Sequence, residues 1–286
     1  MAVMKREPKS ASIGRIVLIA IAIWSWLAAT PAAAAPKADL WERWTAHDPA
    51  SATIVDHGAW DRFLGRYLST DEAGVNRVRY GAVVGTDRRA LNGYLADMSG
   101  TPVSALDRPQ QLAFWVNLYN ALTVAVVLDA YPVASIRDID ISPGLFADGP
   151  WGRKLFAVEG EAVSLDDIEH RILRPIWRDP RIHYAVSCAS VGCPNLRPMA
   201  MTAATTEAYL DAGARDYIND PRGAAVADGR LVVSSLYDWY QADFGGDATG
   251  VIHHLRQYAR PPLAAALDGV MDIADDRYDW SLNDAD

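Results

Sequence analysis

The fold depends on one long apolar stretch, residues 109–131, which reads PQQLAFWVNLYNALTVAVVLDAY. Apolar residues lie almost all round a helix of this sequence, so the pattern predicts a helix that is buried on every side. Proline is tolerated in the first turn of a helix and stops it beyond its end, as expected here of Pro109 and Pro132. We therefore expect this helix to be the centre of the domain.

Two asparagines, Asn117 and Asn120, interrupt the apolar run. A buried amide is costly unless its donors and acceptors find partners. We therefore expect both side chains to be buried, with their amides bonded to the backbone or to the segment 164–190.

Helices and strands are both expected around this helix, without a regular alternation. Apolar spacing and turn residues predict helices at 40–46, 60–68, 90–98, 164–173, 205–218, 236–244 and 251–258. Strands are expected at 75–84, 181–188 and 230–234, with a hairpin over 154–163 that turns at Glu159 and Gly160. The mixture predicts a single compact α+β domain over residues 36–286, mostly helical, with a small central β-sheet that contains 181–188.

The first 35 residues have the composition of a secretion signal. Basic residues precede the apolar run 16–29, which is shorter than the roughly 20 residues that span a bilayer. The small residues of 30–35 (TPAAAA) supply a cleavage site. We expect cleavage close to Pro36 and a soluble periplasmic or secreted product, the alternative being an uncleaved anchor. No later stretch reads as long and apolar enough to cross a membrane, so no stable membrane span is expected after processing.

The charge balance argues against nucleic acid as a partner. The chain has a net charge of −9, and loss of the signal, with four basic residues and one acid, takes it to about −12. Nucleic acids and anionic lipids both require a basic surface. The partner expected is a small-molecule or peptide ligand. The aspartates of the last twenty residues predict a solubilising tail, because EF-hand spacing is absent, and no metal or cofactor is expected.

The helix 164–173 (SLDDIEHRIL) carries the first candidate site residues, Glu169 and His170. Ser164 is placed to cap this helix, with Asp167 three residues later as a capping-box partner. A short connection joins the helix to the run 181–198, so the two segments are expected to pack close together.

The run 181–198 (RIHYAVSCASVGCPNLRP) is the densest in reactive side chains. An even pair of cysteines in an oxidising compartment is read first as a disulfide, here between Cys188 and Cys193. Closing so small a ring stabilises the fold by about 2 kcal/mol on the chain-entropy estimate. This is the first of four interpretations.

In the second interpretation Cys188 is a nucleophile. A reactive thiolate needs a base or cation nearby, which His170 or His183 would supply, with Glu169 or an asparagine orienting the imidazole. His183 leaves the opposite face of the expected strand from Cys188, so His170 is the better placed.

Two further interpretations use the same residues. A zinc site of His170, His183, Cys188 and Cys193 has suitable ligand types, but its spacing matches no common zinc finger. A nucleophile elbow at Ser190, with His253 or His254 downstream, would need a helix directly after the strand, where prolines intervene.

Six motifs occur in an order that resembles the domain-of-unknown-function family 547. They are FWVNLYNALTV, YPVASIRDI, Pro150-Trp151, SLDDIEHRILRP, DPRIHYAVSCASVGCPNLRP and SSLYDWYQADF, and they extend over about residues 106–244. The resemblance implies a compact domain, often exported in bacteria, and implies no settled reaction. By matching position, its characteristic residues are Trp115, Asn117, Tyr119, Asn120, Asp167, Glu169, His170, His183, Cys188, Ser190, Cys193 and Pro194.

These observations predict an exported domain with a polar centre. Its expected site residues are Cys188, His183, His170, Glu169, Asn117 and Asn120. Two functions stay open. One is a cysteine-dependent hydrolase or acyl transferase, and the other is a non-catalytic binding or scaffold domain held by a Cys188–Cys193 disulfide.

Overall fold

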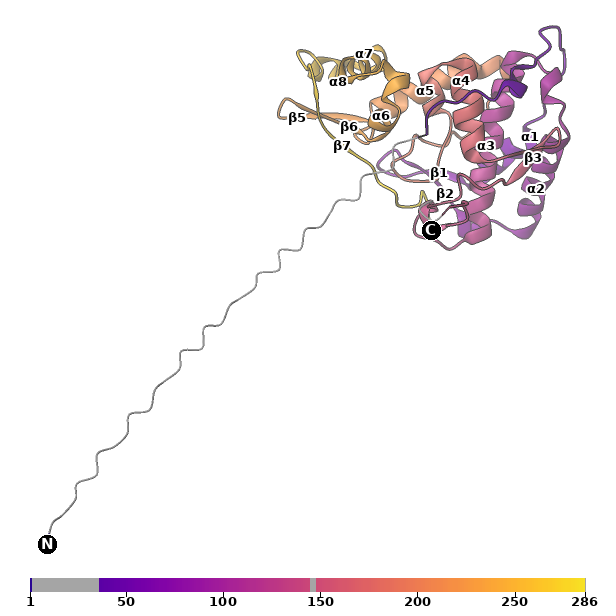
Figure 1. Ribbon diagram of the computed structural model, residues 1–286, viewed down its shortest axis with the longest axis horizontal. Coiled ribbons are helices and arrows are strands. Elements are labelled where there is room, and N and C mark those ends of the chain that lie inside the picture. The colour runs from indigo at the N-terminus through magenta and orange to yellow at the C-terminus, as the bar shows by residue number, and fades with distance from the viewer. Residues whose placement is uncertain (2–35, 145–147, 286) are drawn as a thin grey trace. The chain divides into compact units, whose positions relative to one another are not determined.

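A computed structural model (Figure 1) describes residue 1, residues 36–144 and residues 148–285. Apart from Met1, the predicted signal segment 1–35 therefore lies outside the described residues. From Pro36 onward the described residues fold into one compact unit. Its α-helices are α1 (Gly58–Tyr67), α2 (Gly85–Gly100), α3 (Arg108–Ala130), α4 (Arg174–Trp177), α5 (Thr206–Ile218), α6 (Leu236–Trp239), α7 (Ala248–Tyr258) and α8 (Pro261–Ala266).

Helix α3 is the long buried helix that the sequence predicts. Asp107 caps it by accepting a hydrogen bond from Gln110 N (2.8 Å), and the helix ends just before Tyr131 and Pro132. By length and composition alone α3 could span a membrane, which corrects the expectation that no stretch after the signal qualifies. In the structure 94% of an 18-residue apolar stretch of this helix is buried inside the protein, because α3 is the core around which the larger hydrophobic cluster forms.

The strands form three small antiparallel or mixed sheets among the described residues, which confirms the α+β class. Two are hairpins, β1 (Leu68–Thr70) with β2 (Asn76–Val78), and β3 (Phe156–Val158) with β4 (Glu161–Val163). The second is the predicted hairpin, and Glu159 and Gly160 adopt positive φ angles at its turn. The third sheet has the order β5 (Ala224–Ala227), β6 (Arg230–Ser234), β7 (Ile273–Arg277), and Figure 1 shows it beside α6 and α8.

The acidic C-terminal segment is part of the fold, which corrects its interpretation as a solubilising tail. Strand β7 pairs in parallel with β6 and contributes the exposed Asp275 and Asp276. Charged residues are typical of an edge strand, because they discourage pairing with another chain. Beyond β7, Leu282 and Asn283 are buried.

The segment 181–188, expected as the central strand, is not a strand. Asp179 caps a short 3-10 helix, η6 (Pro180–Tyr184), by accepting from Arg181 N (2.9 Å), and an irregular segment follows. Ile182 and Tyr184 are buried all the same. A short, fully buried apolar run looks alike in a strand and in a helical turn, so periodicity could not separate the two.

Three predicted helices are shorter, divided or differently wound. Residues 40–46 form only the 3-10 turn η1 (Glu42–Thr45), and 236–244 divides at Tyr240 into α6 and the 3-10 helix η8 (Gln241–Phe244). The helix after Ser164 is a π-helix, η5 (Asp167–Leu173), that continues into α4. The remaining 3-10 turns are η2 (Tyr80–Ala82), η3 (Val103–Ala105), η4 (Ile136–Asp138) and η7 (Ala203–Thr205).

The predicted capping box at Ser164 is confirmed. Ser164 N donates to Asp167 Oδ2 (2.8 Å), and Asp167 N donates to Ser164 Oγ (3.1 Å). Within η5 the wider π-turn lets Arg174 N reach Glu169 O. Such π-turns are rare and frequently lie at functional sites.

Candidate functional site

His183 is the centre of a buried group of charged side chains. Its Nε2 lies 2.7 Å from Asp243 Oδ2, and its Nδ1 lies 3.5 Å from Glu169 Oε1. The imidazole stacks on the ring of Tyr240, with centroids 4.2 Å apart. Three elements, η5, η6 and η8, therefore bring two carboxylates to one imidazole.

Arg174 completes this charged group. Its Nε donates to Asp243 Oδ2 (2.6 Å), and its Nη1 donates to Pro36 O (2.7 Å) and to His170 Nδ1 (3.0 Å). Since arginine only donates, His170 Nδ1 is the acceptor and the proton of the neutral ring is on Nε2. That nitrogen faces Asp166 Oδ1 at 3.7 Å.

The pKa shifts show which groups carry charge. Burial raises the pKa of Glu169, but the neighbouring His170, His183 and Arg174 outweigh burial and lower it to about 2. The pKa of Asp243 is likewise held well below its ordinary value, because hydrogen bonds from His183 and Arg174 outweigh burial. Burial lowers the pKa of His183, but its two carboxylate partners raise it above its ordinary value. Two carboxylates thus face the Arg174 guanidinium and an imidazole whose protonated form they favour.

Two further ionisable side chains, His170 and Asp166, lie at the edge of this charged group. Burial lowers the pKa of His170 to about 4, so its ring is neutral at pH 7. Burial, followed by the charge of Glu169, raises the pKa of Asp166 to about 6. The Asp166 side chain is 39% exposed, so it is the accessible carboxyl group of this centre.

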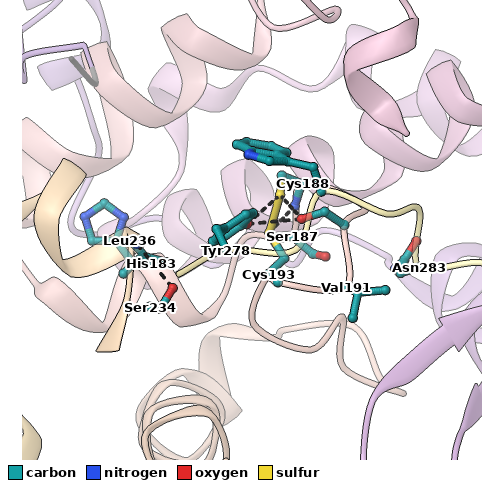
Figure 2. The surroundings of a disulfide bond; sticks show 12 residues. His183, Ser187, Cys188, Val191, Cys193, Ser234, Leu236, Tyr278 and Asn283 are labelled. Atoms are coloured by element: carbon teal, nitrogen blue, oxygen red, sulfur yellow. Dashed lines mark hydrogen bonds between the residues drawn. A yellow bond between two sulfur atoms is a disulfide. The ribbon is translucent and has the colours of Figure 1, made fainter. Parts of the chain in front are cut away.

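Cys188 and Cys193 form a disulfide, with their Cα atoms 6.1 Å apart. Figure 2 shows the hydroxyl of Tyr278 and the backbone around Ser187 close to this bond. The hydroxyls of Ser190 and Tyr278 each lie 3.1 Å from Cys188 Sγ. These two cysteines are the only ones in the chain, so neither sulfur is a free thiol in this state.

The disulfide favours the first of the four interpretations of this loop. Zinc ligation would need both sulfurs, and within the described residues no group of three or more His, Cys, Asp or Glu side chains is arranged to hold a metal ion. Ser190 is buried, and a turn rather than a helix follows it, which contradicts the nucleophile elbow. His254 Nε2 is bonded instead to the hydroxyl of Tyr184 (2.9 Å).

Asn117 and Asn120 are 0% and 1% exposed, and both ends of each amide bind backbone. Asn120 Nδ2 donates to Ala185 O (2.9 Å), and its Oδ1 accepts from Ser187 N (2.8 Å). Asn117 makes the equivalent pair of bonds with N and O of Met201. The prediction of buried amides bonded to backbone is confirmed, and Asn120 positions the chain just before Cys188.

The structure therefore brings Glu169, His170 and His183 together, whereas Cys188 has other neighbours. No hydrogen bond between either imidazole and a sulfur occurs in the described part of the chain, where both rings bind carboxylates or Arg174.

Five residues of the site were not predicted from the sequence: Asp166, Arg174, Tyr240, Asp243 and Tyr278. Tyr240 and Asp243 lie in the SSLYDWYQADF motif, one of the six that carry the family resemblance, and this was a signal that could have marked them as site residues. Tyr278 lies beyond every motif and offered none.

Comparison with known proteins gave one match. Residues 103–218 match a family described as "Protein of unknown function, DUF547". No curated protein and no solved structure matches the chain. Glu169, His170 and Cys188 lie inside the matched residues, whereas Asp243 and Tyr278 lie after them.

Proposed function

Since the chain contains a DUF547 domain, whose family description records no activity, we propose its function from its own residues. The proposal is an exported domain that binds a small-molecule or peptide ligand, with the Cys188–Cys193 disulfide holding the loop beside the binding face. Export is supported by the predicted signal, and N-terminal sequencing of the secreted protein tests it, with a start near Pro36 expected. Intact Met1 in the membrane fraction would contradict it.

The observation that carries the binding proposal is a group of four large aromatic side chains that stay partly exposed, Trp151, Trp239, Tyr278 and Trp280, here called the aromatic face. Trp280 is packed against the other three, with ring centroids 5.8, 5.5 and 4.7 Å away. Tryptophan and tyrosine are enriched at binding interfaces, because they bury much area at little entropic cost.

The aromatic face adjoins the polar centre. Asp166 N donates to Trp151 O (3.0 Å), and Trp239 is followed directly by Tyr240, which stacks on His183. A ligand stacked on the indoles would therefore have the exposed carboxyl of Asp166 within reach. An apolar surface with a few placed polar groups is typical of ligand sites.

A ligand screen tests this proposal. A library of small molecules and peptides is titrated against the protein while the change in tryptophan emission or melting temperature is measured. Ligands should lose affinity for Trp239→Ala and Trp280→Ala and keep it for Trp177→Ala, a partly exposed tryptophan that lies over Arg108. Ligands indifferent to the first two substitutions would refute the binding face.

A cysteine-dependent hydrolase or acyl transferase is the second candidate, and it applies to the reduced protein. The hydroxyls of Ser190 and Tyr278 favour it, because both would donate hydrogen bonds to a Cys188 thiolate. A thiol count on the purified, unreduced protein separates the candidates. Two free thiols would favour the nucleophile, and none would favour the bridged binding domain.

A further inference from the structure

The two sulfurs of the disulfide have different surroundings. Cys188 is half-buried, whereas Cys193 is only 6% exposed. We propose that Cys188–Cys193 is a thiol–disulfide exchange site, opened by an external thiol that attacks Cys188. This redox activity goes beyond ligand binding and does not depend on it.

The exchange proceeds in two balanced steps. A thiolate, RS⁻, attacks Cys188 Sγ, a bond forms between these two sulfurs, and the Cys188–Cys193 bond breaks with its electron pair leaving on Cys193 Sγ. A second thiolate then attacks the R sulfur, releasing RSSR and the Cys188 thiolate. Two protons from the two thiols end on Cys188 and Cys193. The disulfide is reduced by two electrons, and the external thiol is oxidised.

Both sulfurs have hydrogen-bond donors that suit a thiolate. Cys188 N lies 2.9 Å from Cys193 Sγ, so the leaving sulfur carries a backbone donor from the start. On the other side the hydroxyls of Ser190 and Tyr278 face Cys188 Sγ. Donors beside a sulfur lower its thiol pKa and speed its departure.

The loop between the cysteines is held by the C-terminal segment without the disulfide. Val191 N donates to Ser281 O and Gly192 N to Asp279 O, both at 2.8 Å, and Asn283 N donates to Ala189 O at 2.9 Å. The contact at Gly192 is so close that a Cβ there would lie 2.7 Å from Asp279 N. Because these bonds stay when the sulfurs separate, the disulfide can open without unfolding the domain.

The aromatic face would sense the state of this bond. The Tyr278 hydroxyl contacts Cys188 Sγ, and its ring packs against Trp239 and Trp280 with centroids 4.7 Å away in both cases. Reduction removes the S–S bond beside this ring, so the emission of the tryptophans should change when the protein is reduced.

Single-cysteine variants test the proposal. Cys193→Ser and Cys188→Ser are each incubated, folded, with oxidised glutathione, and adducts are followed by intact mass. Cys193→Ser, which keeps Cys188, should gain one glutathione. Cys188→Ser keeps only the buried Cys193 thiol, which should react at least about tenfold more slowly. The double variant is the control. Equal rates for the two single variants would overturn the proposal.

A second measurement uses the unaltered sequence, in case a variant does not fold. The folded mature protein is treated with dithiothreitol, alkylated and digested. Both cysteines should be alkylated, Cys188 first at partial reduction, while the cooperative melting transition persists. Thiols released only in denaturant, or loss of the transition on reduction, would show a purely structural bridge. Neither assay involves the ligand of the aromatic face, so each proposal can fail alone.

Discussion

Replacing Asn120 with leucine should destabilise the domain far more than a surface substitution. The change keeps the size of the side chain but removes its donor to Ala185 O and its acceptor for Ser187 N. Each buried backbone group left without a partner costs about 1–3 kcal/mol. Leucine recovers part of this through its apolar contacts, so we expect a net loss of about 2–4 kcal/mol in the free energy of unfolding.

Thermal and urea unfolding, followed by circular dichroism, measure this effect. For a domain of this size a loss of that order lowers the melting temperature by roughly 5–15 °C. Asn92→Leu is the matched control, because Asn92 is an exposed residue of helix α2, and we expect a change within about 0.5 kcal/mol there. If both variants melt alike, the two hydrogen bonds of Asn120 do not stabilise the fold and the reasoning is refuted.

Three further changes probe the rest of the structure. Asp243→Asn leaves the buried Arg174 and His183 without their shared carboxylate, so the free energy of unfolding, measured by denaturant titration, should fall by about 3 kcal/mol. Asp238→Asn, at an exposed position, should change it by almost nothing. Equal stabilities of the two variants would contradict the charged centre. His57, His170 and His254 have pKa values lowered by burial to about 4, so the stability that these neutral rings contribute should be complete above about pH 6.5 and fall toward pH 4. His57→Gln should reduce that slope by at most about 1.4 kcal/mol per pH unit, and an unchanged slope would exclude His57 as a contributor. Deleting residues 272–286 removes β7 and the bonds to the cysteine loop, so the melting transition should be lost or strongly lowered; an unchanged melt would restore the solubilising tail.

Local pattern was sufficient where the physics is local. The apolar run of α3, its flanking prolines, the turn at Glu159 and Gly160, and the capping box at Ser164 each act within a few residues, and the structure contains all of them. The amides of Asn117 and Asn120 were also predictable, because a buried polar group must find a partner wherever the chain supplies one. The identity of the backbone groups that the two amides bind was not predictable.

The helical turn η6 and the division of the 236–244 segment at Tyr240 were not predictable from periodicity. In a short run such as 180–184, burial on all sides removes the contrast between faces that distinguishes a strand from a helical turn. Tertiary packing then decides the backbone, here through the Asp179 cap and the contacts of His183 with Asp243.

Apolar patterning was enough to predict an α+β domain around one buried helix, and the residue types along the chain pointed to Glu169, His170, His183 and the cysteine pair. The partners of these residues depend on how the chain packs: the cysteines are joined to each other, while the histidines bind Glu169, Asp166, Arg174 and Asp243 instead of a thiol. Asp243 lies 60 residues along the chain from His183, and Tyr278 lies 90 residues along it from Cys188. Such contacts depend on how distant elements pack, and no local pattern encodes that packing.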